Sequence, residues 1–342
     1  MKAVRKTRPE VGADLVDIPV PKIKPGHVLV KVQATSICGT DVHIWDWNKW
    51  AQGRIKYPQT MGHELAGEVV EIADDVKSID VGDYISSETH IPCGHCYQCK
   101  TGKMHICQNM TILGVDTDGA FAEYILVPEV VAWKNDRSIE PGVAAIQEPM
   151  GNAVDTVFID EIAGKSALLV GIGPIGMIAA GLCRIGGATT IIATDLIEYR
   201  LDMAKKMGAD YAINPKNDNL YDRVMEITGG NGVDVVLEMS GSAKALNDAL
   251  KCLTPGGRVS LLGLFNDDIT LDINNGMVFK AAKVYGITGR RMFETWYMTR
   301  NFLASKRIDV KPVITHTLPL EEYARGMELM KSGESGKIVL IP

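Results

Sequence analysis

Four cysteines lie within fifteen residues, in a pattern that suits a metal ion. Four thiolates on one short loop match the tetrahedral sulfur coordination that zinc adopts in closed structural sites. The first three cysteines also resemble the cysteine run of a ferredoxin. The seven residues between the third and fourth cysteines, and the lack of a Cys-Pro ending, disfavour an iron–sulfur cluster. We therefore predict a structural zinc lobe over about residues 90–108, in which His95 and His105 are solvated neighbours and not ligands. The predicted ligands are Cys93, Cys96, Cys99 and Cys107.

A glycine-rich segment combines the residue types that bind a dinucleotide phosphate. Gly171, Gly173 and Gly176 form Gly-x-Gly-x-x-Gly, directly after the apolar run 167–170 and before a helical pattern. The first glycine permits a tight turn, the second lets the backbone approach a pyrophosphate, and the third lets the helix pack on the strand. The helix N-terminus adds free N–H groups and a partial positive charge. The motif, with Ile175 inside it, predicts a cofactor site.

Two charged residues beyond the motif bear on the choice of cofactor. Asp195 closes the next strand nineteen residues after Gly176, where a carboxylate accepts hydrogen bonds from ribose hydroxyls and repels a 2′-phosphate. The alternative role for Asp195 is a helix N-cap. Arg200 suits stacking on an adenine, although an arginine at this place also accommodates a 2′-phosphate. On balance the sequence favours NAD.

Later strand ends are expected to flank the nicotinamide half of the cofactor. The carboxyl ends of strands line the ligand crevice in open α/β sheets. Ordinary strand and turn glycines have the same appearance in a sequence, so these positions depend on the rest of the motif. The predicted positions are Leu262, Gly263 and Leu264 after the fifth strand, and Gly286 and Ile287 in the sixth.

A second group of metal-binding residue types is spread over a longer stretch of the chain. It comprises Cys38, the adjacent pair His63 and Glu64, and Glu148 before a proline. Cys, His and a carboxylate make the open kind of zinc site, in which one position remains for water or substrate. Each alone also has an ordinary explanation, as a small core residue, a hydrogen-bonded loop histidine or a solvated acid. Their presence beside a zinc lobe and a dinucleotide motif favours a catalytic metal.

Positioning these groups requires two kinds of folding unit. The first 150 residues are typical of a β-rich domain, with alternating or short apolar runs at 28–34, 65–72 and 122–127. From residue 166 onward, short strands alternate with helical stretches, which predicts βαβ units and a parallel sheet. Helices near 293–304 and 321–331 and a last strand at 337–341 are expected to rejoin the first domain. The six strands of the sheet are expected at about 166–170, 189–194, 210–214, 233–239, 258–263 and 284–289.

Length and composition agree with this division and exclude several classes of protein. The chain has 342 residues, of which 46% are hydrophobic and 23% charged, as expected for two globular domains. A net charge of -6 without a Lys/Arg cluster argues against nucleic acid and anionic membranes as partners. The longest apolar stretch, 168–182, is interrupted by Gly and Pro, unlike a membrane span. No secretory signal is evident, and seven cysteines do not suggest disulfides, so we expect a cytoplasmic protein.

The motifs occur in an order that resembles the zinc-dependent medium-chain alcohol dehydrogenase family over the whole chain. The resemblance implies an α/β protein: a GroES-like catalytic domain of residues 1–147 and 295–342, with a Rossmann NAD-binding domain, 148–294, inserted. It implies two zinc ions per chain, the catalytic one bound by Cys38, His63 and Glu64. Many members have Cys or Asp near position 148, so Glu148 either ligates transiently or assists a proton relay. The family also implies an oligomer, for which we expect a homotetramer.

Three segments narrow the resemblance within the family: 38–45 together with 48–50, then 148–154, and above all Gly-Arg-Arg-Met-Phe-Glu-Thr-Trp-Tyr at 289–297. They are similar to segments of those family members that act in threonine catabolism and oxidise the C3 hydroxyl of L-threonine to 2-amino-3-oxobutanoate. A polyol or 2,3-butanediol dehydrogenase of the same family is the alternative enzyme. A non-catalytic nucleotide-binding relative is a different class of alternative, but it would be expected to lose Cys38, His63 or Thr40, and all three are present.

The implied chemistry assigns roles to a hydroxyl and an imidazole. Hydride leaves a carbinol carbon easily only once its oxygen carries negative charge, and zinc, which lowers the pKa of bound water from about 15.7 to about 7, should acidify an alcohol likewise. Thr40 would hydrogen-bond the alkoxide and His43 would pass the proton onward; their alternatives are a turn hydroxyl and a surface histidine. His90 and Arg290 are candidates for contacts with the substrate pocket or the cofactor phosphates. The alternative for His90 is that it only orients the zinc lobe, and the alternative for Arg290 is a solvated charge at the end of a strand.

Overall fold

The computed structural model describes all 342 residues, which separate into two compact units. Unit 1 comprises Met1–Glu148 and Ile314–Pro342, and unit 2 comprises Pro149–Val313. The sequence placed the return to the first domain at residue 295. In the structure, helix α10 (Glu294–Ala304) belongs to unit 2, where Phe302 stacks on Phe158 with 5.5 Å between ring centroids. The apolar face of α10 is thus buried in unit 2, and the chain re-enters unit 1 at Ile314.

Unit 1 is built on a seven-stranded sheet with the order β10-β6-β5-β3-β18-β17, in which β9 also pairs with β3. The last strand of the chain, β18, inserts beside β3, so residues about 300 positions apart become neighbours, for example Val339 and Ser36. Two small sheets, β2-β1-β4 and β7-β8, complete the unit. The strands are β1 (Lys2–Lys6), β2 (Asp14–Asp17), β3 (His27–Ser36), β4 (Gln59–Thr60), β5 (Glu64–Ile72), β6 (Tyr84–Ser87), β7 (His90–Ile91), β8 (Thr111–Ile112), β9 (Tyr124–Pro128), β10 (Ala132–Lys134), β17 (Ile314–Pro319) and β18 (Lys337–Ile341).

Unit 1 also contains short helices, of which only the one near 321–331 was predicted from the sequence. The others escape a periodicity search because they have fewer than two full turns, and their start signals are local. Helix α2, for example, begins after Asn48, whose side-chain Oδ1 accepts a hydrogen bond of 3.0 Å from the backbone N–H of Ala51. The helices are α1 (Gly39–Trp45), α2 (Lys49–Arg54), α3 (Tyr97–Lys100), α4 (Pro141–Ala145) and α11 (Tyr323–Ser332), with single turns η1 (Met104–Ile106), η2 (Glu129–Val131) and η5 (Leu320–Glu322). Helix α5 (Gln147–Phe158) begins in unit 1 and continues into unit 2.

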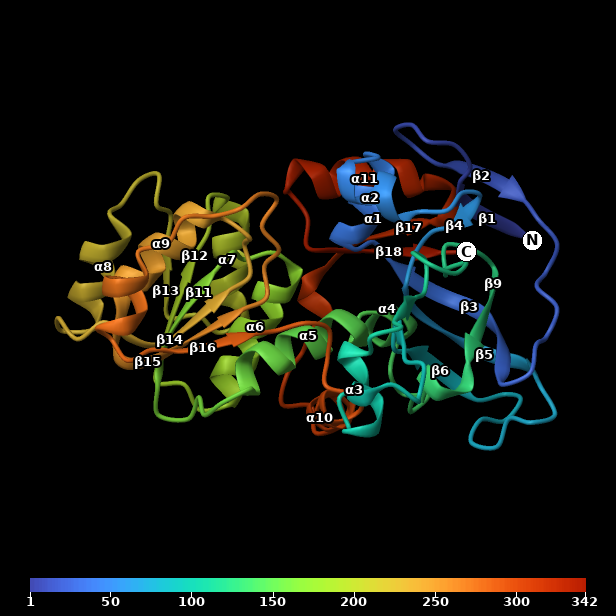
Figure 1. Ribbon diagram of the computed structural model, residues 1–342. Coiled ribbons are helices and arrows are strands. Elements are labelled where there is room, and N and C mark those ends of the chain that lie inside the picture. The colour runs from blue at the N-terminus through green and yellow to red at the C-terminus, as the bar shows by residue number, and fades with distance from the viewer. The chain divides into compact units, whose positions relative to one another are not determined.

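Unit 2 contains a six-stranded parallel sheet with the order β13-β12-β11-β14-β15-β16 (Figure 1). All six strands expected from the sequence are present, and the strand order reverses between β11 and β14, the topological switch point of a doubly wound sheet. The strands are β11 (Ser166–Val170), β12 (Thr190–Thr194), β13 (Tyr211–Ile213), β14 (Val233–Glu238), β15 (Leu253–Leu261) and β16 (Lys283–Gly286). The helices are α6 (Pro174–Ile185), α7 (Glu198–Met207), α8 (Leu220–Ile227) and α9 (Ala243–Cys252), with short turns η3 (Asn274–Val278) and η4 (Lys311–Val313).

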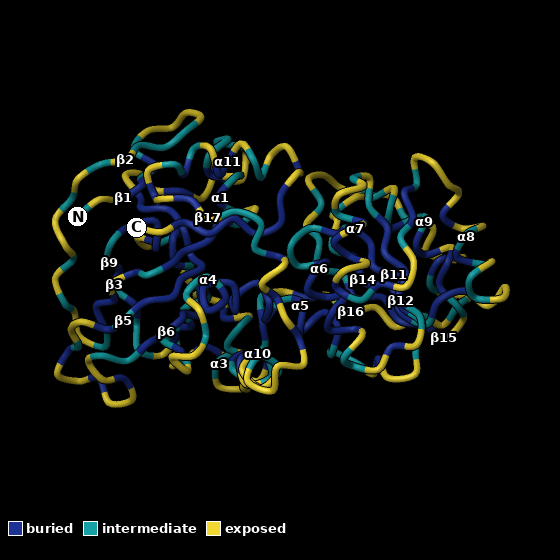
Figure 2. The backbone as a smooth tube through the Cα atoms, turned by 180° about the vertical axis from the view of Figure 1, so that it is seen from behind, coloured by how far each residue is buried: buried dark blue, intermediate teal, exposed yellow.

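The central strands of this sheet are apolar because helices cover both of their faces. Four of the five residues of β11 are buried, and the same holds for β12. A continuous apolar run of this kind is typical of a parallel strand between two helical layers. Figure 2 shows these strands in the colour of buried residues, whereas the turns around α8 are exposed. The loops that follow the strands are therefore held on a rigid base.

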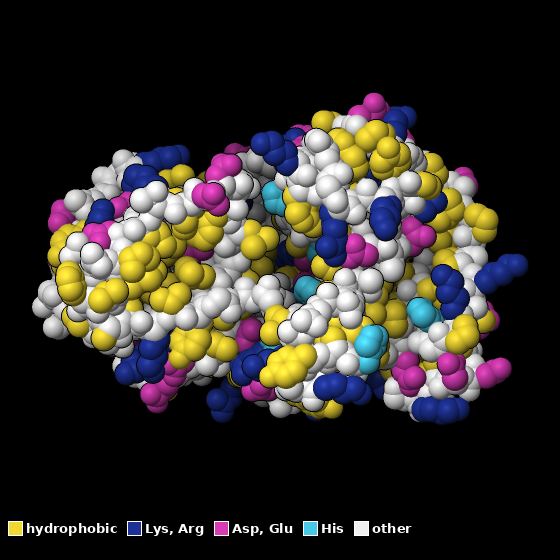
Figure 3. Space-filling model, in the orientation of Figure 1, with side chains coloured by type: hydrophobic (Ala, Val, Ile, Leu, Met, Phe, Trp, Pro, Cys, Tyr) yellow, Lys and Arg dark blue, Asp and Glu magenta, His cyan; other side chains and the backbone are white.

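The surface carries charges of both signs. On the face shown in Figure 3, Lys and Arg side chains are interspersed with Asp and Glu, and no large region has a single sign. This agrees with the small net charge of the chain. None of the helices combines the length and the hydropathy that crossing a bilayer requires.

Candidate metal centres and cofactor site

The four cysteines of the predicted lobe meet in space. Their Sγ atoms all lie within 4.8 Å of one another, and Cys96 Sγ is 3.5 Å from Cys99 Sγ and 3.7 Å from Cys107 Sγ. A tetrahedron of sulfurs around zinc, with Zn–S bonds of about 2.3 Å, has S–S edges of about 3.8 Å. The separations and the donor set thus fit zinc. His95 is exposed, and neither His95 nor His105 belongs to the group.

Backbone amides of the lobe direct their hydrogens at sulfur. Cys107 Sγ accepts hydrogen bonds of 3.3 Å from the N–H groups of both Cys93 and Asn109. The N–H of His95 and the side chain of Asn109 lower the pKa of the Cys93 thiol to about 5, whereas burial raises that of Cys99 to about 12. The lobe therefore favours at least one thiolate, the form that binds metal, through local hydrogen bonds alone.

A second cluster of ligand atoms forms where β3, α1 and β5 meet. Atoms of Cys38, His63 and Glu64 lie within 4.8 Å of one another. Cys38 is the N-cap of α1, directly after β3, and Glu64 is the first residue of β5. His63 and Glu64 are buried, and Glu148, in the first turn of α5, is buried as well. Glu148 is not part of the close group, but its charge acts on both His63 and Glu64.

A buried lysine that no sequence pattern singled out balances the charge of this cluster. Lys337 of β18 has 2% of its surface exposed, and its Nζ lies 2.5 and 2.6 Å from the two carboxylate oxygens of Glu64. Nζ also donates to the carbonyl of Ile37 at 2.9 Å, and the hydroxyl of Ser36 donates to Glu64 Oε2. Burial and the charge of Glu148 raise the pKa of Glu64, while Lys337 opposes that rise. The carboxylate is thus a rigidly held, charge-compensated group.

Asp41 fixes the other side of the cluster. Its Oδ2 accepts a hydrogen bond of 2.9 Å from the N–H of Cys38, its Oδ1 accepts one of 3.2 Å from the N–H of Gly62, and Oδ1 lies 3.8 Å from His63 Nδ1. Burial alone would lower the pKa of His63, but the charges of Cys38 and Asp41 outweigh it and raise the pKa to about 10. A carboxylate behind a ligand histidine is typical of metal sites. With sulfur, nitrogen and carboxylate donors together, the residues fit zinc.

The residues of the expected proton relay lie next to this cluster. Thr40 Oγ1 is 3.8 Å from Cys38 Sγ. His43, one turn further along α1, is exposed, and its Nδ1 lies 3.0 Å from the side-chain nitrogen of Asn48. His90 lies at the edge of the lobe, with its Nδ1 3.0 Å from an oxygen of Glu88, which is fully buried. The sequence analysis predicted no role for either Asn48 or Glu88.

The glycines of the dinucleotide motif divide into two kinds. Gly171 has φ +88°, and a Cβ there would lie 2.7 Å from Cα of Ser240. A Cβ on Gly176 would lie 2.3 Å from the carbonyl oxygen of Gly171. A Cβ on Gly173, however, would meet nothing within 4 Å. Two glycines are therefore required by packing inside the protein, and Gly173 borders open space, as the predicted approach of a pyrophosphate requires.

Asp195 and Arg200 lie beside the glycine turn. Asp195 Oδ2 accepts a hydrogen bond of 2.7 Å from the N–H of Ile172, and Oδ1 accepts one of 3.0 Å from Ile197 N–H. Arg200 Nη1 is 3.9 Å from Asp195 Oδ2. The carboxylate therefore ties the glycine turn to the start of α7, which begins with Ile197 as its N-cap. Asp195 and Arg200, both predicted to contact the cofactor, therefore lie close to each other and next to the glycine motif.

The remaining predicted cofactor positions follow β15 and β16. The N–H groups of Leu262 and Gly263 donate to the backbone oxygen of Glu238 at 2.9 and 3.2 Å, and Leu264 is 88% exposed. Gly286 ends β16, and Ile287, which follows it, is buried.

Arg290 is also buried, so it is not the solvated charge that was its alternative. Its Nη1 donates to Oδ1 of Asn152 at 2.9 Å. A Cβ on Gly151 would lie 2.5 Å from Cδ of Arg290, so the absence of a side chain at Gly151 provides the space that the Arg290 side chain occupies.

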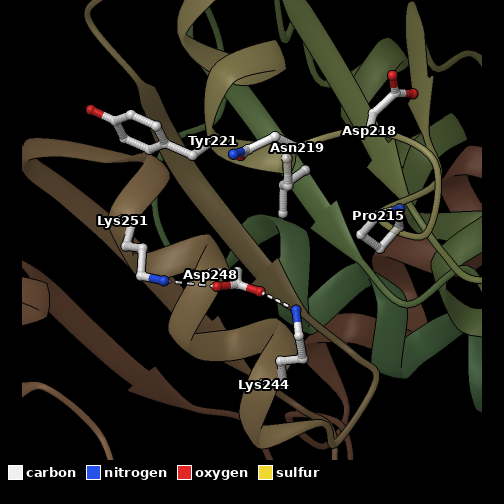
Figure 4. A pocket seen from close by; sticks show the side chains of 8 residues that line it. Pro215, Asp218, Asn219, Tyr221, Lys244, Asp248 and Lys251 are labelled. Atoms are coloured by element: carbon white, nitrogen blue, oxygen red, sulfur yellow. Dashed lines mark hydrogen bonds and ion pairs between the residues drawn. The ribbon is translucent and has the colours of Figure 1, made fainter.

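A cavity of about 440 Å³ lies elsewhere in unit 2, between α8, α9 and the segment after β13 (Figure 4). Asp248 pairs with Lys244 at 2.7 Å and with Lys251 at 2.9 Å on its α9 side, opposite Tyr221 and Asn219. None of the predicted metal, relay or cofactor residues lines it.

Comparison with known protein families agrees with both units. Residues 24–137 match the model of the alcohol dehydrogenase GroES-like domain, and residues 174–305 match that of the zinc-binding dehydrogenase. L-threonine 3-dehydrogenase of Pyrococcus furiosus is 54% identical over 342 residues, covering 100% of this chain and 98% of the relative. The enzyme of that name from Bacillus subtilis is 46% identical, with 100% and 99% covered.

Solved structures share the fold at lower identity. A zinc-binding dehydrogenase of Sinorhizobium meliloti bound to NADP has a TM-score of 0.91 at 28% identity, covering 100% of this chain and 99% of the other. An Escherichia coli alcohol dehydrogenase complexed with NADH has a TM-score of 0.91 at 27% identity, with the same coverage. For 2R,3R-butanediol dehydrogenase of Bacillus subtilis, the TM-score is 0.90 at 28% identity, again with that coverage. The predicted family and fold class are confirmed: the chain belongs to the zinc-dependent medium-chain alcohol dehydrogenase family.

Proposed function

We propose that this chain oxidises the C3 hydroxyl of L-threonine to 2-amino-3-oxobutanoate, with NAD as the hydride acceptor. The observation that carries the proposal is the close group of Cys38, His63 and Glu64 in a chain that is 46–54% identical, over its full length, to L-threonine 3-dehydrogenases. The polyol or 2,3-butanediol alternative is not favoured, because the butanediol dehydrogenase compared above is only 28% identical.

Cys38, His63 and Glu64 would hold a catalytic zinc, and the four cysteines of the lobe a second, structural one. Bound zinc supplies a Lewis acid that makes the hydroxyl of a bound alcohol more acidic. The Asp41 carboxylate lies behind the His63 ring and favours its charge, and Lys337 with Ser36 orients the Glu64 carboxylate. Although burial opposes it, the charges of Cys38 and Asp41 raise the pKa of His63, and only the neutral imidazole ligates, so metal binding would be accompanied by loss of this proton.

Thr40 and His43 would carry the hydroxyl proton away from the substrate. Both lie on α1, whose first residue follows Cys38, so one rigid element sets the position of a ligand, a hydroxyl and an imidazole. Holding these groups in a fixed geometry lowers the entropic barrier to proton transfer. Glu148 is assigned to the same path, since its buried carboxylate acts on His63 and Glu64 without belonging to their close group.

The Rossmann unit would bind NAD rather than NADP. The support is Asp195, whose carboxylate beside the glycine turn disfavours a 2′-phosphate. The predicted cofactor positions from Gly171 to Arg290 all belong to unit 2, and the predicted metal and relay positions all belong to unit 1. We accordingly assign unit 2 to the cofactor and unit 1 to the metal chemistry. A homotetramer in the cytoplasm, acting in threonine catabolism, completes the proposal and is supported by the family resemblance.

Assays on the purified protein test the proposal. Reduction of NAD is followed with L-threonine, sorbitol or 2,3-butanediol, and reduction of NADP with L-threonine, while zinc is counted per chain. We expect L-threonine and NAD to be preferred, and about two zinc ions per chain. Activity on sorbitol or butanediol without activity on threonine would overturn the substrate. The variant C38S should keep the lobe zinc, lose the second ion, and lose activity by about a thousandfold, because a Lewis acid contributes several kcal/mol.

A further inference from the structure

Glu238 occupies the central position at the switch point of the parallel sheet. It is the last residue of β14, and the register places it level with Val170, which ends β11, and Leu261, which ends β15. The loops that follow these two strands contain Gly171 and the segment 262–264, both predicted to contact the cofactor. The side chain of Glu238 is fully buried. A buried carboxylate at this place has no role in the chemistry described so far.

One oxygen of this carboxylate organises the neighbouring loop. Oε1 accepts hydrogen bonds from the N–H of Ser240 at 2.8 Å, from the Ser240 hydroxyl at 2.5 Å, and from the N–H of Gly241 at 2.9 Å. Three donors directed at one oxygen suit the ionised group. The loop is packed tightly, since a Cβ on Gly171 would meet Ser240 and a Cβ on Gly241 would lie 2.2 Å from the carbonyl oxygen of Leu264.

The other oxygen, Oε2, has no hydrogen-bond partner although it is buried. A Cβ on Gly263 would lie 2.6 Å from it, so this oxygen faces the loop after β15. No lysine or arginine pairs with Glu238. Glu64, equally buried in unit 1, shows the contrast, because Lys337 lies within 2.6 Å of both its oxygens. A buried charge without a partner is unfavourable, so its retention calls for a compensating interaction.

We propose that the uncompensated carboxylate of Glu238 makes the cofactor site prefer oxidised over reduced nicotinamide. The nicotinamide ring of NAD⁺ carries a positive charge and that of NADH carries none, whereas their phosphates are the same. A fixed negative charge in a low-dielectric base below the 262–264 loop attracts the cationic ring and leaves the neutral ring nearly unaffected. Any repulsion from the pyrophosphate is common to both forms and cancels in the comparison.

This inference rests on the proposed assignment of unit 2 to NAD, and it sets the direction of the reaction that the site favours. Tighter binding of the oxidised cofactor loads the protein for alcohol oxidation, and weaker binding of the reduced form eases its release. Glu238 does not need to touch the cofactor for this effect, because the charge acts across the 262–264 loop, which Oε2 faces. It is therefore a specificity-determining residue for the oxidation state of the cofactor, and not a catalytic residue.

The test measures dissociation constants of NAD⁺ and NADH for the zinc-loaded protein in the absence of substrate. Glu238→Gln keeps the shape and an acceptor oxygen for the three donors but removes the charge. We expect NAD⁺ to bind roughly five- to tenfold more weakly and NADH to change by less than about twofold. The matched control is Glu226→Gln, an equal change of net charge at an exposed residue of α8, which should change neither constant.

Glu238→Asp separates the charge from the hydrogen bonds. This variant keeps the charge but shortens the side chain, so it should weaken both cofactors by similar factors and preserve their ratio. Equal changes for both cofactors in Glu238→Gln, or an altered ratio in Glu238→Asp, would overturn the inference. If Glu238→Gln does not fold, the ratio in Glu238→Asp decides alone. Since no substrate is present, a protein that binds both cofactors but does not oxidise threonine would refute the proposed function and leave this result intact.

Discussion

The two candidate metal-binding clusters of unit 1 differ in their ligand atoms and balance their charges in different ways. The lobe takes four cysteine sulfurs from fifteen consecutive residues and directs backbone amides and the side chain of Asn109 at them. The Cys38 cluster takes its groups from segments up to 300 residues apart and surrounds them with full charges. Asp41, Glu64, Glu148 and Lys337 are all buried there.

The difference reflects what each site must do. A closed site has to hold one ion permanently, and dipoles that belong to the same loop are sufficient for that. A reactive site must keep an open position and must stabilise a charge that changes during the reaction. Fixed protein charges and dipoles can do this without the reorganisation that mobile water requires. Buried charges of both signs provide a fixed field, but each one is stable only while its partner is present. Damage to the lobe should therefore cause only local loss of metal and structure. Damage to the Cys38 cluster should also destabilise the fold around it.

The largest expected effect comes from breaking the ion pair of the buried cluster. Lys337→Met leaves Glu64 buried without its cation, which should lower the free energy of unfolding by about 3–5 kcal/mol. It should also weaken zinc retention, because the Glu64 carboxylate loses the partner that orients it. Urea unfolding and zinc content measure the two effects.

Two variants control this experiment. Lys337→Arg keeps a cation and should retain much of the stability. Lys134→Met removes an exposed lysine that pairs with Asp83 at 2.6 Å, and it should change the free energy of unfolding by less than about 1 kcal/mol. Equal losses in Lys337→Met and Lys134→Met would contradict the view that the buried pair supports the cluster.

This comparison also marks the limit of what the sequence could predict. The lobe was predictable because its ligands are adjacent in the chain, and the six strands of unit 2 were predictable because each is a continuous apolar run. Lys337 was not predictable, because only the pairing of β18 with β3 brings it to Glu64. Asp41 lies inside a recognised motif, but its contact with His63 depends on the turn at Gly62, which has φ +86°. The helix α10 was assigned to the wrong unit because a helical period does not say which core the helix packs against.

Removal of one lobe ligand should give the next largest effect. Cys96→Ser leaves three sulfurs and opens the site, so zinc should fall from about two to about one per chain, with the Cys38 cluster retaining its ion. Limited proteolysis should then cut within residues 93–107 before the rest of the chain unfolds. Elemental analysis and mass spectrometry of the fragments provide the measurements. Loss of both ions in Cys96→Ser would show that the two sites are coupled and not independent.

Thiol reactivity in the metal-free protein should reveal the local hydrogen bonds of the lobe. A pKa of about 5 makes Cys93 a thiolate at pH 7, whereas a pKa of about 12 keeps Cys99 protonated. Iodoacetamide should therefore modify Cys93 at least about tenfold faster than Cys99 at pH 7. Because the pKa is lowered, the rate at Cys93 should fall only about twofold between pH 7 and pH 5, while an ordinary thiol would slow about a hundredfold. Peptide mapping with and without added zinc measures this, and Cys183, whose pKa burial raises to about 12, is the internal reference.

The smallest expected effect lies at the exposed edge of the reactive cluster, where it depends on local hydrogen bonds as the lobe does. Asn48 Oδ1 accepts from the N–H of Ala51, so its amide group faces His43 and donates to Nδ1, which leaves the proton of the neutral ring on Nε2. Asn48→Ser keeps an N-cap for α2 but removes this donor, and it should lower kcat for threonine oxidation about two- to fivefold at nearly unchanged stability. Asn48→Ala removes the cap as well and should lower the free energy of unfolding by about 1 kcal/mol. A kcat for Asn48→Ser equal to that of the unmodified protein, over the whole pH profile, would mean that the tautomer of His43 is set by something other than Asn48.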